Sequence, residues 1–156
     1  MRNILGNSYI KISVPILLFM SLMGCKSNTQ EISISSSTKE EIEMKLIIDN
    51  QNIEVSWLNN ESVDDLKSLA TNELTISMHQ YGGFEQTGPI GKSIRRDDVQ
   101  MDVVPGDIVL YQGNQISVFY NPSSWSYTRL GHIDMNQDAL KELLEKESVT
   151  FTLSTK

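Results

Sequence analysis

Residues 105–134, PGDIVLYQGNQISVFYNPSSWSYTRLGHID, carry the strongest fold signals in the chain. Two largely apolar segments, 108–112 and 115–120, lie on either side of Gly113 and Asn114. Gly and Asn both tolerate the positive φ that tight hairpin turns require. The stretch therefore predicts two antiparallel strands joined at Gly113-Asn114.

A second turn and a third strand follow. Residues 121–124, Asn-Pro-Ser-Ser, are typical of a turn. Beyond it, Trp125, Tyr127 and Arg129 alternate with other residues and so share one face of a strand. The stretch thus predicts a run of β structure rich in aromatic side chains.

The segments before this stretch predict a hairpin and a helix. Apolar residues alternate over 44–48 and 53–57 around a turn-forming Asp-Asn-Gln-Asn, which predicts a hairpin with one buried face. Apolar residues at helical spacing predict a helix over 62–70. Ser62 followed by Asp65 gives it a weak capping-box pattern.

Another alternating segment, 74–81, predicts a strand that ends at a Gly-Gly pair. His79 and Tyr81 fall on its polar side, so we expect them to face away from the core. Residues 84–104 predict mostly loop with short strands, and Ile94, Val99, Met101 and Val103 could supply one edge of the sheet.

The chain's end predicts a helix and a closing strand. Asn136 can cap a helix over 137–146, and residues 149–154 alternate as a strand. The whole pattern is mainly β, with about eight strands and two short helices. A closed barrel with a helix capping each end fits this order, because closure removes exposed strand edges.

Composition sets limits on the class of protein. With 156 residues, 39% hydrophobic and 21% charged, the chain is long enough for one globular domain. The first 24 residues hold two basic residues and no acid, so the remainder has 11 basic against 20 acidic residues, a charge of −9. The one basic pair, Arg95-Arg96, is followed at once by two acids. We therefore expect no nucleic-acid partner.

Residues 1–24 predict a leader segment and not part of the fold. A basic start precedes an apolar run over 12–23, which is shorter than the roughly 20 residues that span a bilayer and matches a signal-peptide core. The run ends in Leu-Met-Gly-Cys at 22–25, which resembles the lipobox of bacterial lipoprotein precursors. That resemblance implies cleavage after Gly24 and attachment of fatty acids such as palmitate at Cys25.

Cys25 has other interpretations, namely a buried thiol in an N-terminal helix or a spare thiol in an uncleaved anchor. As the chain's single cysteine, it excludes a disulfide within the chain and a Cys-based metal cluster. Residues 25–43 are polar and rich in Ser, which predicts a flexible tether, with an edge strand at 32–34 as the alternative. The folded domain is then expected over 44–156.

Residues 44–156 resemble the bacterial cyclophilin-like family, whose members are small closed β-barrels. The segments that carry the resemblance are 78–85 (MHQYGGFE), 105–108 (PGDI), 110–111 (LY), 119–120 (FY) and 125–133 (WSYTRLGHI). The resemblance covers essentially the whole domain and implies the barrel fold expected above.

Cyclophilins isomerise X–Pro bonds with an apolar proline pocket and a positioned Arg that donates toward the prolyl nitrogen, against a barrier of about 18–20 kcal/mol. Catalytic members carry this Arg in a Phe-His-Arg strand motif. The comparable strand here, 75–81 (TISMHQY), has His and Gln but no Arg. Within 44–156, Arg129 is the only Arg outside the Arg95-Arg96 loop. The resemblance therefore leaves isomerase activity open.

Candidate ligand-contacting residues are aromatic or titratable side chains expected on one outer groove, where cyclophilins bind theirs. They are His79, Tyr81, Phe84, Tyr120, Trp125, Tyr127 and Arg129. Each has an ordinary structural alternative: an exposed His, aromatics that only pack, and an Arg paired with an acid. His132 is interpreted as structural.

No cofactor is expected. Two His residues without a third ligand at metal spacing do not predict a zinc site, and no Ser or Cys has the flanking motif of a nucleophile. A redox-linked role would need a separate flavoprotein partner.

The sequence thus predicts a lipoprotein of the bacterial cell envelope, anchored through Cys25 and facing outside the cytoplasm. Its domain is expected to be a non-catalytic module that binds a peptide, a protein or a small ligand. The alternative is a divergent peptidyl-prolyl isomerase acting on exported proteins.

Overall fold

The computed structural model describes residues 43–156. The leader expected over 1–24, the lipidation site at Cys25 and the tether as far as residue 42 lie outside the described residues. Neither of the described α-helices has the length and apolar character needed to cross a membrane.

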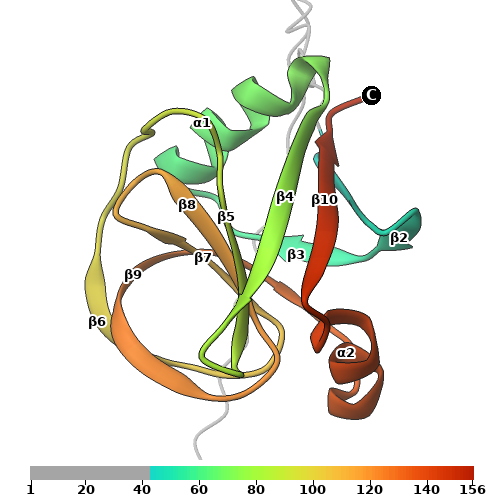
Figure 1. Ribbon diagram of the computed structural model, residues 1–156. Coiled ribbons are helices and arrows are strands. Elements are labelled where there is room, and N and C mark those ends of the chain that lie inside the picture. Colours follow the sequence, from blue (N-terminus) through green and yellow to red (C-terminus); the bar gives the residue numbers. More distant parts are fainter. Residues whose placement is uncertain (1–42) are drawn as a thin grey trace, which may run out of the picture. The chain divides into compact units, whose positions relative to one another are not determined.

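The described chain forms ten strands, two α-helices and one 3₁₀ turn (Figure 1). In order they are β1 (Lys45–Ile48), β2 (Gln51–Ile53), β3 (Val55–Trp57), α1 (Glu61–Leu69), η1 (Ala70–Asn72), β4 (Leu74–Tyr81), β5 (Glu85–Pro89), β6 (Val99–Val103), β7 (Asp107–Tyr111), β8 (Gln115–Phe119), β9 (Ser123–Ile133), α2 (Gln137–Leu144) and β10 (Ser148–Ser154).

The strands form one antiparallel sheet that curls into a nearly closed barrel. Neighbouring strands follow the order β2-β1-β10-β4-β5-β8-β7-β9-β3, and β6 pairs with β9 beside this path. Figure 1 shows α1 and α2 at opposite ends of the sheet. The mainly-β barrel with two short helices that the sequence predicts is confirmed.

The barrel nearly closes because one predicted strand divides in two. The segment expected over 53–57 pairs with β1 as far as Ile53 and with β9 from Val55 onward, so only Glu54 separates β2 from β3. Beside this seam the indole Nε1 of Trp57 donates a 2.6 Å hydrogen bond to the Met44 carbonyl. The first and last strands of the order are therefore joined by the chain itself.

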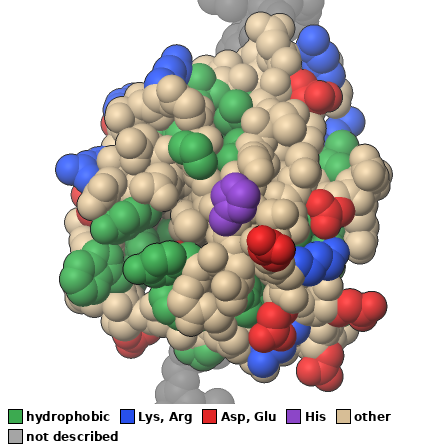
Figure 2. Space-filling model, in the orientation of Figure 1, with side chains coloured by type: hydrophobic (Ala, Val, Ile, Leu, Met, Phe, Trp, Pro, Cys, Tyr) green, Lys and Arg blue, Asp and Glu red, His purple; other side chains and the backbone are tan. Residues whose placement is uncertain are grey.

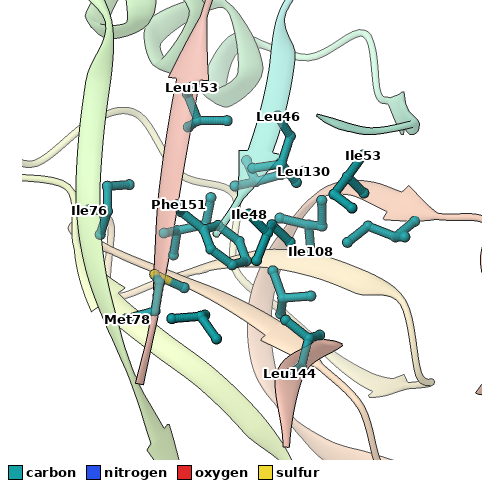
Figure 3. Close-up of a cluster of buried hydrophobic side chains, with 14 of the residues drawn as sticks. Leu46, Ile48, Ile53, Ile76, Met78, Ile108, Leu130, Leu144, Phe151 and Leu153 are labelled. Atoms are coloured by element: carbon teal, nitrogen blue, oxygen red, sulfur yellow. The ribbon is translucent and has the colours of Figure 1, made fainter. Parts of the chain in front are cut away.

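The barrel core is built by the inward phase of each strand. Figure 3 shows its side chains meeting from opposite sides of the sheet. They include Leu46 and Ile48 of β1, Ile76 and Met78 of β4, Ile108 of β7, Leu130 of β9, and Phe151 and Leu153 of β10. Both helices add to the same core, α1 through Val63 and Leu66 and α2 through Leu140, Leu143 and Leu144. Alternation along each strand thus separates an inner apolar face from an outer face.

The first helix begins one residue earlier than predicted, and its cap differs. Asn60 is the N-cap, and its side-chain oxygen accepts a 2.9 Å hydrogen bond from the Val63 amide. Ser62 lies inside the first turn and is buried, so the capping box predicted from Ser62 and Asp65 is wrong. The Asn60 amide also donates to the Arg129 carbonyl at 3.0 Å, which ties the start of α1 to β9.

The second helix is capped by Asn136 as predicted, through a 2.9 Å hydrogen bond from the Ala139 amide. It ends at Leu144 and not at Lys146. The side-chain amide of Gln86, from β5, donates to the carbonyls of both Leu144 (2.8 Å) and Lys146 (2.6 Å). A side chain of β5 therefore supplies the hydrogen-bond donor for the carbonyl that ends α2 and for one just beyond it.

The hairpin turn of β7 and β8 lies one residue earlier than predicted. Positive φ occurs at Gln112 (51°) and Gly113 (77°), while Asn114 has no positive φ. Tyr111 pairs with Gln115 on either side of the turn. The Asn114 amide donates a 3.2 Å hydrogen bond to the Tyr111 carbonyl, which closes it.

Candidate functional site: an aromatic groove

The outward phase of the strands makes a second apolar cluster, separate from the barrel core. Ile108 and Leu110 of β7 point into the barrel, so Val109 and Tyr111 point out. The outer cluster contains Val103, Val109, Phe119 and Tyr127, with Phe84, Met101 and Tyr111 packed against it. A barrel strand with apolar side chains on both faces needs cover on the outside, and β6 supplies part of it by pairing with β9.

An open depression of about 480 Å³ lies over this outer cluster. We call it the aromatic groove. Its lining residues come from β4, β5, β7, β8 and β9 and from the segments that join them, and they are Tyr81, Phe84, Glu85, Thr87, Tyr111, Gln115, Ser123, Ser124, Trp125 and Tyr127. The lining combines five aromatic rings with one carboxyl group and a few neutral polar groups.

The rings of the groove contact one another. Phe84 stacks on Phe119 with centroids 6.2 Å apart, and Phe119 meets Tyr127 edge-on at 5.5 Å. Tyr127 in turn meets Tyr111 at 6.0 Å, and Tyr81 meets Phe84 at 5.9 Å, both edge-on. Such packing holds flat apolar surfaces in fixed orientations.

The turn before Phe84 brings its ring onto this surface. Gly82 and Gly83 both have positive φ, at 60° and 73°. A Cβ atom on Gly82 would overlap the Phe84 ring, so a side chain there would displace the ring. The Gly-Gly pair that the sequence marks as a strand end therefore also shapes the groove.

Part of the aromatic surface faces solvent. Trp125 is 58% exposed and Tyr81 is 63% exposed. Figure 2 shows hydrophobic side chains gathered at the lower left of the displayed face, on the side where Figure 1 draws β6 and β9. Exposed apolar side chains that gather in one contiguous patch commonly mark an interaction site.

Glu85 is the one acidic residue of the lining. Its side chain is 7% exposed, and its Oε2 atom is buried without a hydrogen-bond partner among the described residues. Burial raises the pKa of this carboxyl, and the neighbouring Ser117 hydroxyl offsets the rise in part. Burial also raises the pKa of the Tyr127 phenol, and the nearby Glu85 charge adds to that rise.

The structure brings four of the seven candidate residues together. Tyr81, Phe84, Trp125 and Tyr127 all line the aromatic groove. The other three, His79, Tyr120 and Arg129, do not.

Tyr120 points the other way. It is fully buried, at 0% exposure, in the barrel core. It shares the inward phase of Ile116 and Val118 on β8, so its neighbour Phe119 takes the outer face. Tyr120 therefore belongs to the core and not to the ligand surface.

His79 is exposed on β4, as its phase predicts, but it does not line the groove. It pairs in register with Thr87 of β5, and its Nε2 lies 3.5 Å from the Ser77 hydroxyl. His79 thus lies next to the groove, because its partner Thr87 is one of the lining residues.

Arg129 is held by an acid. Its guanidinium forms an ion pair with Asp107, a side chain that is 1% exposed, and donates to the Asp102 carbonyl at 3.3 Å. Asp107 also pairs with His132 Nδ1 at 2.9 Å and accepts from the Val104 amide at 3.0 Å. The sequence left open whether Arg129 pairs with an acid, and Asp107 is that acid.

The sequence profile of the cyclophilin-like family matches residues 46–154. The chain belongs to the cyclophilin-like family. No curated protein sequence matches it. The profile spans the barrel from β1 to β10, so family membership covers the groove and the core alike.

Sequence reasoning about this cyclophilin-like domain missed six of the lining residues. They are Glu85, Thr87, Tyr111, Gln115, Ser123 and Ser124. Tyr111 and Gln115 could have been found from strand phase, because they follow the outward register of β7 and β8. Glu85 gave no such signal, because a carboxyl in a β strand is ordinarily solvated and its burial depends on other strands.

Between residues 43 and 156, no group of three His, Cys, Asp or Glu side chains is arranged to hold a metal ion. The groove of this cyclophilin-like domain therefore offers binding through aromatic surface, hydrogen bonds and one buried carboxyl.

Proposed function

We propose that this cyclophilin-like domain is a non-catalytic binding module that takes a peptide, a protein segment or a small molecule into the aromatic groove. The observation that carries the proposal is the open depression of about 480 Å³ lined by five aromatic side chains. Ligand pockets typically measure about 300–1,000 Å³ and combine apolar walls with a few polar groups. The groove has both properties.

The position of Arg129 favours binding over isomerisation. An isomerase of the cyclophilin type needs a donor aimed at the prolyl nitrogen from the wall of the proline pocket. Among the residues that line the groove there is neither Arg nor Lys. Arg129 lies on the same strand as Trp125 and Tyr127, but its guanidinium is committed to Asp107.

We also propose that the module works outside the cytoplasm, held at a bacterial membrane by lipid on Cys25. This rests on the sequence of residues 1–25 alone, in which a basic start and an apolar core lead to Leu-Met-Gly-Cys. Two or more acyl chains anchor a protein stably, at about 0.8 kcal/mol for each buried CH₂.

A fragment screen followed by amide shift mapping tests the binding function. The protein would be the chain without its first 25 residues. We expect bound fragments to shift amides of β5, β8 and β9 around the groove, and Trp125→Ala to weaken them. Leu58→Ala is the matched control, because Leu58 is also exposed, at 41%, and is not part of the groove lining. Fragments that bind elsewhere, or equally well to Trp125→Ala, would contradict the proposal.

A protease-coupled assay on a proline-containing peptide tests the isomerase alternative on the same protein. We expect the uncatalysed rate of cis–trans conversion, which takes tens of seconds or longer. A rate enhancement that is lost in Arg129→Ala would instead establish the alternative.

A further inference from the structure

We propose that the aromatic groove selects ligands in which an ammonium group is attached to an apolar frame, and that Glu85 is the residue that pairs with the ammonium group. This inference rests on the proposed function, because it takes the groove to be the binding site. It adds the chemical class of the ligand, which is a protonated primary amine, either free or as a lysine side chain.

Among the described residues, no cationic side chain forms an ion pair with the Glu85 carboxyl. Its side chain is more than nine-tenths buried at 7% exposure, and its Oε2 has no hydrogen-bond partner among the described residues. A buried carboxylate is costly unless it is paired with a cation or fully hydrogen-bonded. The groove lining supplies no Lys or Arg, so a cation that pairs with Glu85 in the groove would come from a ligand.

The neutral groups near Glu85 do not take that place. The Ser117 hydroxyl hydrogen-bonds the Glu85 carboxyl and offsets part of the rise in its pKa, but it is neutral and also lies 2.9 Å from the Thr87 hydroxyl. Gln115 also lines the groove, but it is distant from Glu85. Glu85 pairs with Phe119, and Gln115 lies at the opposite end of β8. A donor that enters the groove from outside is therefore the group that would complete the site.

The aromatic walls favour the same ligand. A cation that lies over the face of a Trp, Tyr or Phe ring is attracted by the ring's quadrupole. Trp125 and Tyr127 of β9 and Tyr81 at the end of β4 line the same groove as the Glu85 carboxyl. The chain's charge of −7 also attracts cations and repels anions. An apolar frame against these rings leaves its ammonium group facing Glu85.

The test compares a cationic probe with a neutral one of similar shape. The probes are 2-phenylethylamine, which is an ammonium ion at neutral pH, and 2-phenylethanol. Binding to the chain without its first 25 residues is followed by amide shifts and by the fluorescence of its two tryptophans, of which Trp125 lines the groove. We expect the amine to bind about tenfold more tightly than the alcohol, since removing one partner of a desolvated charge pair costs at least that much.

Glu85→Gln should abolish this preference, because the amine loses affinity and the alcohol does not. Glu142→Gln on the exposed face of α2 is the matched control and should retain the preference. In the unmutated protein, the ¹³Cδ resonance of Glu85 should move with the amine and not with the alcohol, which tests the pairing even where the variant folds poorly. A capped Phe-Lys-Phe peptide, compared with Phe-Gln-Phe, extends the same test from a free amine to a lysine side chain.

Equal binding of amine and alcohol in the groove would overturn the assignment of Glu85 and leave the groove as a binding site. A preference for amine that survives in Glu85→Gln would also overturn it. The fragment screen described above addresses the groove independently, so failure of the amine test and failure of the binding function give different results.

Discussion

Arg129 and Asp107 form an ion pair that joins β9 to the start of β7. Asp107 is almost completely buried, and its second oxygen accepts the Val104 amide. The pair thus fixes the turn that leads into β7. It also keeps the Arg129 guanidinium out of the aromatic groove, and this is why a strand that carries four groove residues contributes no cation to it.

Asp107→Ala should lower the free energy of unfolding by about 3 kcal/mol, because it leaves the half-buried Arg129 charge and the Val104 amide without their acceptor. Urea denaturation followed by circular dichroism measures the change. Asp97→Ala is the control, since the Asp97 side chain is exposed, and it should change the value by less than about 0.5 kcal/mol. A loss in Asp107→Ala no larger than in the control would show that the ion pair contributes nothing to stability.

Trp57→Phe should destabilise the domain by about 1 kcal/mol, because phenylalanine keeps an aromatic ring but cannot donate to the Met44 carbonyl. The same urea titration applies. Trp125→Phe removes an indole N–H from an exposed ring and should leave stability unchanged. Equal effects of the two substitutions would mean that the seam hydrogen bond has no special role.

Asp65 should titrate with a pKa of about 2, below the ordinary 3.8, because hydrogen bonds from the Arg95 side chain and backbone favour its charged form. The ¹³Cγ shift of Asp65 against pH measures it. The pKa is lowered in the folded state, so the stabilisation is complete above 3.8 and is lost as the pH falls through about 2.

Arg95→Gln should raise the Asp65 pKa toward 3.8. Arg96→Gln, which removes the partner of Asp98 instead, should leave Asp65 unchanged. A response of Asp65 to the second substitution and not to the first would contradict the assigned pairing.

Glu85 should make the domain less stable as the pH rises. Burial raises the pKa of its carboxyl above the ordinary 4.5, so the folded state holds the proton more tightly than the unfolded state does. The favourable contribution is complete below 4.5 and is lost as the pH rises through the higher folded pKa. We expect the difference in unfolding free energy between Glu85→Gln and the unmodified protein to grow over this interval. A difference that stays constant with pH would argue against a raised pKa.

Cys25 should incorporate labelled palmitate when the full chain is made in a bacterium, and Cys25→Ala should not. The physical expectation is that acylation moves the protein into the detergent phase of a two-phase extraction. Ser27→Ala, two residues further along, is the control and should behave as the unmodified chain. Palmitate incorporation that persists in Cys25→Ala would refute the lipoprotein assignment.

The groove shows where reasoning from strand phase was sufficient and where it was not. Alternation placed Tyr81 on the outer face of its strand and Trp125 on the same face as Tyr127, and all three line the groove. The same rule, applied to β8, puts Tyr120 in phase with Ile116 and Val118 and therefore inside the barrel. Tyr120 was predicted to contact the ligand because it is aromatic, and not from its position in the strand alternation.

Capping illustrates a different limit. Asn136 was identifiable because one cap residue directly precedes the apolar pattern of α2. Before α1 the sequence offers Asn59, Asn60 and Ser62 within four positions. The Asn60 side chain both caps α1 and donates to the Arg129 carbonyl of β9, a contact that depends on tertiary structure.

The sequence by itself determined most of the features that repeat along the chain: most of the strands, the two helices and the barrel that they form. These follow from local periodicity, because alternate side chains on one strand must point to opposite faces whatever lies beyond it. Tertiary structure alone decided that Glu85 is buried, with one oxygen that has no hydrogen-bond partner among the described residues, and that Asp107 pairs with Arg129. Burial and charge pairing depend on groups that distant strands bring together, so the spacing of residues along the chain does not predict them.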